Sequence, residues 1–267
     1  MMNREILKSI SKPEDKLLIA RLLDQYSFCE TRNRTEHTDF FDLYQQSLIE
    51  KILKKLKISN YVFFGGFEEA ERKVLVFYPE KFQGDIVEKQ KEEILKIISI
   101  ELPNDLISKY THKIYLGGLM KLGIKREKIG DILVLKDGAD IIVTEDIANF
   151  LEFHITELTR FQKSKIEIKP INEARKIEQK TEILSIIVPS MRLDSIVSEI
   201  ISLSRTKAVE VIKEERVFVN FEKETRLARE IKKNDYITIR GKGRVKIGNI
   251  KGKTKKGNLI MEIEKYQ

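Results

Sequence analysis

Apolar side chains recur at helical spacing through the first 58 residues. A Pro-Glu-Asp triplet at residues 13–15 predicts a helix start, because acidic side chains suit the positive end of a helix. A second helix is predicted over residues 38–57, where apolar residues return every three or four positions on one face. These positions are Phe41, Tyr44, Leu48, Ile52 and Leu56. We therefore expect an N-terminal helical segment over residues 1–58.

From residue 60 the pattern changes to short runs rich in aromatic and β-branched residues, which favour strands. Strands are predicted at 61–64, 74–78, 94–102 and 164–168, with a hairpin over 131–143 that turns at Asp137 and Gly138. Thr111 and Thr144 each precede a predicted helix. This alternation predicts an α+β domain over residues 59–170, followed by a charged linker over residues 171–182.

Residues 183–267 predict two helices packed against a small sheet. One amphipathic helix follows Arg192, and Ser204 is placed to cap a second one that carries Ala208, Val211 and Ile212 on one face. Strands are predicted at 217–221, 236–240 and 259–264, with a turn at 257–258.

The charge of the chain is concentrated in this last part. Of a net charge of +8, residues 181–267 carry 19 Lys and Arg against 12 Asp and Glu, whereas residues 1–180 carry 31 against 30. A local excess of this kind is typical of proteins that bind the phosphates of nucleic acid. A solvated basic surface without a partner is the alternative.

Two groups of cations stand out. Arg205 and Lys207 lie in the first turn of the second helix, where free backbone N–H groups favour an anion. The other group lies along a strand edge interrupted by glycines and consists of Arg240, Lys242, Arg244 and Lys246. We expect the cations of the helices and the strand to gather on a single patch that fits a ribose-phosphate surface.

Several short motifs occur here in a fixed order. They are Arg-Leu-Asp at 192–194, Ser-Arg at 204–205, Val-Phe-Val-Asn at 217–220, Asp-Tyr-Ile at 235–237 and Arg-Gly-Lys-Gly-Arg at 240–244. In this order they resemble the S4 RNA-binding domain, although Glu215 stands where that domain usually has glycine. The resemblance implies that RNA is contacted by Arg192, Ser204, Arg205, Lys207, Arg216, Asn220, Arg240, Lys242, Arg244 and Lys246.

Motifs upstream extend the resemblance over almost the whole chain. Residues 64–67, 70–72, 112–117 and 122–132 resemble the YlmH-type proteins, which combine an α+β RNA-binding domain with an S4 domain. This similarity implies binding to the large ribosomal subunit and a role in rescuing stalled ribosomes. Lys125, Arg126 and Lys128, in a loop after a predicted helix, are further candidates for RNA contact. The alternative is that apolar neighbours simply fix this loop to the core.

No catalytic or metal-binding constellation is visible in the sequence. Cys29 is the single cysteine, and the three histidines are scattered, so neither a disulfide nor a zinc site is expected. Residues 248–254 differ from a phosphate-binding P-loop by one residue between the glycines, and we expect a hairpin loop there. Asp194 lies in a triplet that resembles the catalytic motif of pseudouridine synthases, but here the triplet falls inside the S4-like part. We therefore expect no catalysis and no cofactor.

The sequence thus predicts an α+β protein with N-terminal helices, an RRM-like α+β middle domain and a C-terminal S4 domain. We expect it to bind structured rRNA, tRNA or both, and neither DNA nor a membrane. The absence of a long apolar run and of a signal segment at residues 1–5 favours the cytoplasm. Two alternatives stay open, namely an RNA-modifying enzyme with its centre in residues 60–180 and an adaptor that recruits a protein partner through the helical N-terminus.

Overall fold

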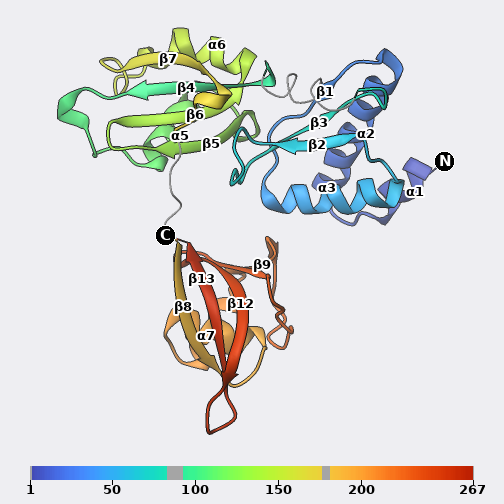
Figure 1. Ribbon diagram of the computed structural model, residues 1–267, viewed down its shortest axis with the longest axis vertical. Helices are drawn as coiled ribbons and strands as arrows, with labels where there is room; N and C mark the ends of the chain where they lie inside the picture. The colour runs from blue at the N-terminus through green and yellow to red at the C-terminus, as the bar shows by residue number, and fades with distance from the viewer. Residues whose placement is uncertain (1, 83–92, 176–180, 267) are drawn as a thin grey trace. The chain divides into compact units, whose positions relative to one another are not determined.

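The computed structural model describes residues 2–82, 93–175 and 181–266. Its contacts divide the chain into two compact units, Met1–Ile177 and Glu178–Gln267. Figure 1 shows the elements of each unit, and the two units are described separately below.

The first unit begins with three helices packed on a small sheet. The helices are α1 (Met2–Ser9), α2 (Pro13–Arg32) and α3 (Leu43–Leu56), and the strands β1 (Glu36–His37), β2 (Tyr61–Phe64) and β3 (Val74–Phe77) pair in the order β1-β3-β2. Asp42 caps α3 in a capping box with Gln45. Ile19, Ile49 and Leu75 are fully buried where helices and sheet meet.

Two expectations for this region need correction. Residues 1–58 are not wholly helical, because Glu36 and His37 pair with β3 as β1. The predicted strands at 61–64 and 74–78 lie in this first sheet and pack on the helices instead of joining the strands that follow. Apolar burial by α2 and α3 accounts for this arrangement, since β3 is buried along its whole length.

The rest of the first unit is a four-stranded antiparallel sheet with two helices. Its elements are β4 (Leu95–Glu101), α5 (His112–Lys121), β5 (Ile129–Val134), β6 (Gly138–Thr144), α6 (Glu145–His154) and β7 (Lys165–Pro170), with short 3-10 turns at Asn104–Leu106, Arg126–Lys128, Ile155–Glu157 and Ile171–Glu173. The strand order β5-β6-β4-β7 and the order of elements are those of a split βαβ unit. Tyr115, Leu119 and Leu151 from the helices bury one face of the sheet.

The other face of this sheet joins the N-terminal part. Phe40 and Val76 pack against Ile97 and Ile142. The backbone N–H groups of Glu71 and Arg72 donate to the half-buried carboxylate of Asp131 at 2.7 and 3.2 Å. Apolar and polar contacts therefore hold both parts together as one unit.

The second unit is a six-stranded sheet with two helices on one face. Its strands pair in the order β10-β9-β11-β12-β13-β8. The elements are β8 (Thr181–Val188), α7 (Leu193–Ile201), α8 (Arg205–Lys213), β9 (Val217–Val219), β10 (Glu222–Lys223), β11 (Tyr236–Ile239), β12 (Gly243–Lys253) and β13 (Leu259–Tyr266). Ile196, Val197 and Ile212 of the helices pack on Val219, Ile237 and other inward side chains of the strands.

The expected α+β class is confirmed by this mixture of helices and antiparallel strands. The predicted linker spans residues 171–182. Its two described ends belong to the units themselves, because Ile171 is buried in the first unit and Thr181 begins β8. Residues 176–180 lie outside the described residues. Residues 248–254, expected as a loop, continue β12 as far as Lys253, and the turn follows at residues 254–258. Within the described residues, none of the helices combines the length and apolar content needed to cross a bilayer.

Candidate nucleic-acid interface

A buried carboxylate at the start of α7 holds two guanidinium groups side by side. Asp194 is only 3% exposed. Its carboxylate accepts hydrogen bonds from Arg192 at 3.1 and 3.0 Å and from Arg205 at 3.1 and 2.7 Å. Burial would raise the pKa of Asp194, but the hydrogen bonds from Arg192 and Arg205 hold it below its ordinary value. Both arginine side chains remain about half exposed, at 43% and 54%, so each can present further N–H donors to a ligand.

The local sequence explains how Arg205 comes to this place. Ser202 ends α7 in the left-handed conformation, and Ser204 caps α8 by accepting the backbone N–H of Lys207 at 3.3 Å. Arg205 is therefore the first residue of α8 and lies where helical N–H groups are unpaired. The side chain of Lys207 pairs with Glu210 at 2.5 Å. Ser204 thus serves the helix cap, while the charged side chain of Arg205 stays about half exposed at the start of α8.

A loop between β10 and β11 supports the start of α7, and sequence reasoning missed it. Glu224 is 4% exposed and accepts hydrogen bonds from Arg226 and Arg229 at 2.6 to 3.0 Å. The hydrogen bond from Arg226 outweighs burial and lowers the pKa of Glu224 to about 2. The carbonyl groups of Leu227 and Arg229 accept the first backbone N–H groups of α7, so the loop fixes the helix start that carries Asp194. Its partners lie only two and five positions further along the chain, but no motif marks Glu224, because the sequence does not show that this carboxylate is buried. The surface formed by Arg192 and Arg205 over the buried Asp194 is called the helix-start surface below.

The strand cations lie elsewhere, and the expectation of a single patch is wrong. Along β11 and β12, Ile237 and Val245 are buried toward the helices. Side chains alternate between the two faces of a sheet, so Arg244 and Lys246 point to the opposite, outer face. The helix cations and the strand cations therefore belong to two surfaces of the same unit.

Three of the four strand cations lie over an aromatic ring. Arg240 lies 5.1 Å from the ring centre of Phe218, Arg244 lies 5.3 Å from that of Phe221, and Lys246 lies 5.7 Å from that of Tyr236. Aromatic faces attract cations and restrict their movement. The outer face thus carries cations in fixed positions over aromatic rings.

Arg216 and Arg240 lie at the far end of α8 from Arg205. Arg216 donates to the carbonyl of Arg240 at 3.0 Å, and the backbone N–H of Arg240 donates to the carbonyl of Arg216 at 3.0 Å. A helix of nine residues is about 13 Å long, which separates this pair from the helix-start surface. Lys242 is exposed in the turn after β11. Asn220 is engaged internally, since its amide donates to Asp235 at 2.8 Å and accepts the backbone N–H of Tyr236 at 2.9 Å.

The cations at 125–128 divide into exposed and structural residues. Arg126 donates to the carbonyl groups of Ile129 and Gly130 at 2.6 and 3.1 Å. Burial, with help from the neighbouring charge of Arg72, lowers the pKa of Arg126 to about 10. Lys128 pairs with Asp39 at 2.6 Å. Of the three predicted contacts, only Lys125 is exposed, so the structural reading of this loop holds for Arg126.

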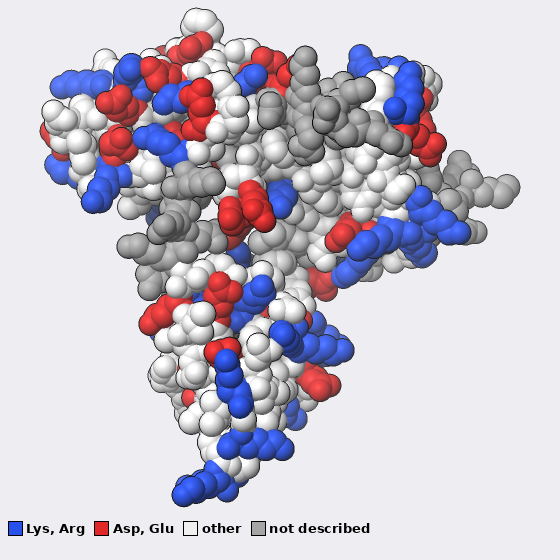
Figure 2. All heavy atoms as spheres, viewed as in Figure 1, with Lys and Arg blue, Asp and Glu red and all other residues white. Residues whose placement is uncertain are grey.

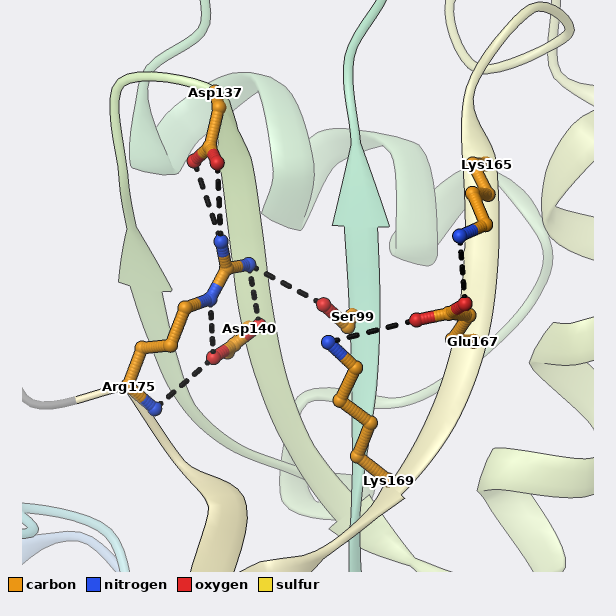
Figure 3. Close-up of polar contacts among 7 residues, drawn as sticks. All are labelled: Ser99, Asp137, Asp140, Lys165, Glu167, Lys169 and Arg175. Atoms are coloured by element: carbon orange, nitrogen blue, oxygen red, sulfur yellow. Dashed lines mark hydrogen bonds and ion pairs between the residues drawn. The ribbon is translucent and has the colours of Figure 1, made fainter.

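The open part of the four-stranded sheet is covered by ion pairs (Figure 3). Arg175 donates to Asp140 at 2.6 and 2.9 Å and to Asp137 at 3.3 Å, and Lys165 and Lys169 flank Glu167 on β7. Burial would raise the pKa of Asp140, but the hydrogen bonds from Arg175 lower it. None of the four described strands β4 to β7 contains an aromatic residue. This face therefore has no rings on which bases could stack.

The space-filling view agrees with the charge count. In Figure 2, Lys and Arg extend along the second unit as far as the turn between β12 and β13, where Lys255 and Lys256 lie. Among the described residues, no cluster of His, Cys, Asp and Glu has the geometry to hold a metal ion.

Comparisons with known proteins match both the α+β part and the whole chain. Residues 88–174, which contain β4 to β7, match the family described as "Putative RNA-binding domain in YlmH". The chain is 27% identical to "Ribosome-associated protein quality control protein P2" of Bacillus subtilis (strain 168), over 96% of this chain and 97% of that protein. A solved structure, "Cell division protein ylmH from Streptococcus pneumoniae", is 21% identical with a TM-score of 0.49 and covers 64% of this chain and 98% of its own. The family match and the whole-chain similarity confirm that this chain resembles the YlmH-type proteins.

Proposed function

We propose that this protein is a non-catalytic RNA-binding factor that acts on the ribosome. The second unit serves as an S4-type domain for structured rRNA or tRNA, and the large ribosomal subunit is the expected partner. The relative in Bacillus subtilis is named as a ribosome-associated quality control protein, which supports this assignment. The family matched by residues 88–174 is described as RNA-binding, which supports it further.

The observation that carries the proposal is the arginine pair at the start of α7 and α8. Guanidinium groups bind phosphate through two parallel N–H donors, and a fixed guanidinium loses less conformational entropy on binding. Asp194 fixes Arg192 and Arg205 in this way. The helical N–H groups beside Arg205 favour the same anion. The carboxylate of Asp194 is engaged by both guanidinium groups, and this supports a positioning role in place of a catalytic one.

The test is binding of a structured RNA hairpin by the full chain, measured by fluorescence anisotropy. The variant Arg192→Gln/Arg205→Gln removes both charges and should weaken binding at least tenfold, since charged hydrogen bonds contribute about 1.5 to 3 kcal/mol each. The matched control is Lys255→Gln/Lys256→Gln, which removes two charges from the β12–β13 turn.

The control should weaken hairpin binding less than threefold. Equal losses in both variants would show that only net charge matters and would contradict a specific site. Because Asp194 loses its partners in the arginine variant, thermal unfolding followed by circular dichroism must show that the second unit remains folded at the temperature of the binding measurement.

A further inference from the structure

The outer face of the sheet in the second unit carries a row of aromatic rings. Phe221 and Tyr236 have ring centres 5.4 Å apart, and Tyr236 and Tyr266 have ring centres 6.2 Å apart. Phe218 lies on β9 with its neighbours Val217 and Val219 turned inward, so its ring lies on the same outer face. All four rings are half-buried. Apolar rings on an open sheet face need a partner or a function to account for them.

Cations accompany these rings on the same face. Arg240, Arg244 and Lys246 lie over Phe218, Phe221 and Tyr236. In the part of the chain that the structure describes, no carboxylate lies within 4.0 Å of the charged groups of Arg240 or Lys246. Glu264 on β13 lies opposite Lys246 in the register and limits the positive area on that side. The outer face thus has a bounded area of positive charge and aromatic surface.

This combination suits unpaired nucleotides better than a duplex. Single-stranded nucleic acid is bound where a positive surface follows the backbone and aromatic rings or guanidinium planes stack with bases. Bases of a duplex are already stacked inside it and cannot reach such rings. Arg244 and Lys246 are two residues apart on one strand, so their Cα atoms are separated by about 6.6 Å along the strand direction, with ring surface beside each.

We propose that the outer face of this sheet binds unpaired RNA nucleotides, as a second surface separate from the helix-start surface. The residues that form it are Phe218, Phe221, Tyr236, Arg240, Arg244 and Lys246. The inference rests on the proposed function as an RNA-binding protein and adds the class of RNA that this face takes. It also explains why the strand cations point away from the helices.

The experiment uses the full chain with two probes, a twelve-nucleotide oligouridylate and an RNA hairpin whose only unpaired nucleotides are those of a short, structured tetraloop. The variant Arg240→Gln/Lys246→Gln removes charge, and Phe218→Leu removes a ring but keeps charge and apolar character. Each should weaken oligouridylate binding at least fivefold, because stacking on one ring contributes about 1–3 kcal/mol per base. Hairpin binding should change less than twofold. Arg192→Gln/Arg205→Gln should show the reverse pattern.

Tyrosine fluorescence gives a second measurement, because the chain has eight tyrosines and no tryptophan. Oligouridylate should quench the emission of the wild type, and Tyr236→Leu should reduce that quenching. The inference is overturned if the wild type does not bind oligouridylate, or if Phe218→Leu binds it as well as the wild type does. If the wild type binds oligouridylate but does not bind the hairpin, the result contradicts the proposed function and still supports the outer face as a binding surface.

Discussion

Glu215 occupies a backbone conformation that glycine adopts more easily. It lies between α8 and β9 with φ at 58°, in the left-handed region that penalises side chains. The sequence marks this position through the resemblance, because the S4 domain usually has glycine here. Its carboxylate pairs with Lys223 at 2.5 Å, and both side chains are about half exposed. An exposed pair of this kind contributes little to stability.

The substitution Glu215→Gly should therefore stabilise the second unit by roughly 0.5–1 kcal/mol, since relief of the left-handed strain exceeds the loss of the ion pair and the added flexibility of glycine. Differential scanning calorimetry of the full chain should show a higher melting temperature for this unit. Lys223→Gln serves as the control that removes only the ion pair. A melting temperature below that of the wild type would mean that the ion pair matters more than the backbone strain.

Arg126 differs from its neighbour Lys125 in role, although both are cations of one loop. Arg126→Ala should destabilise the first unit by about 1–3 kcal/mol, because the carbonyl of Gly130 would lose the Arg126 donor and that of Ile129 would keep Arg72 but lose Arg126. Lys125→Ala should leave stability within about 0.5 kcal/mol, because this side chain is exposed. Urea unfolding followed by circular dichroism compares them. Equal stability of the two variants would contradict the structural role of Arg126.

At the scale of elements, the loop between β10 and β11 is a support for α7. Its carbonyl groups accept the N–H groups of Leu193 and Asp194. Within the loop, the buried carboxylate of Glu224 accepts hydrogen bonds from Arg226 and Arg229. The pKa of Glu224 is about 2 in the folded protein, against an ordinary value of 4.5. A lowered carboxyl pKa contributes stability above pH 4.5 that is lost as the pH falls toward 2.

The second unit should thus lose melting temperature steeply between about pH 5 and pH 2. Glu224→Gln should be less stable than the wild type at pH 7, by roughly 2–3 kcal/mol, with a weaker pH dependence in that window. Calorimetry of the full chain from pH 2.5 to pH 7 measures both effects. Glu230→Gln removes an exposed carboxyl of the same loop and should behave as the wild type does. The same pH dependence in Glu224→Gln would assign the acid sensitivity to other carboxyls, such as Asp194.

The elements themselves were largely predictable, because their causes are local. Apolar spacing placed α7, α8 and the strands of the hairpin at 129–144 within a few residues. Features that depend on distant partners were not predictable. The strand β1 exists only because β3 pairs with it, and β8 becomes an edge strand by pairing with β13. Likewise, composition identified Arg244 and Lys246 as candidates, but only the pairing register shows which face they occupy.

At the scale of the whole molecule, the net positive charge is concentrated in one of the two units. The excess of basic residues falls within residues 181–267, which lie in the second unit, whereas the first unit is nearly neutral. Each unit has its own apolar core. Electrostatic attraction to RNA is therefore expected to come mainly from the second unit, and any contribution of the first unit is expected to rest on contacts of another kind.

Salt dependence of hairpin binding tests this division. If about four to six phosphates are neutralised, the logarithm of the binding constant should fall with the logarithm of salt concentration at a slope of roughly −3 to −5. The isolated fragment 178–267 should fold through its own core and keep most of that slope, even where its affinity is lower. The fragment 1–177 should bind weakly with a slope near zero. A slope shared equally by the two fragments would show that RNA-binding charge is distributed over both units, and would remove the basis for assigning the phosphate contacts to the second.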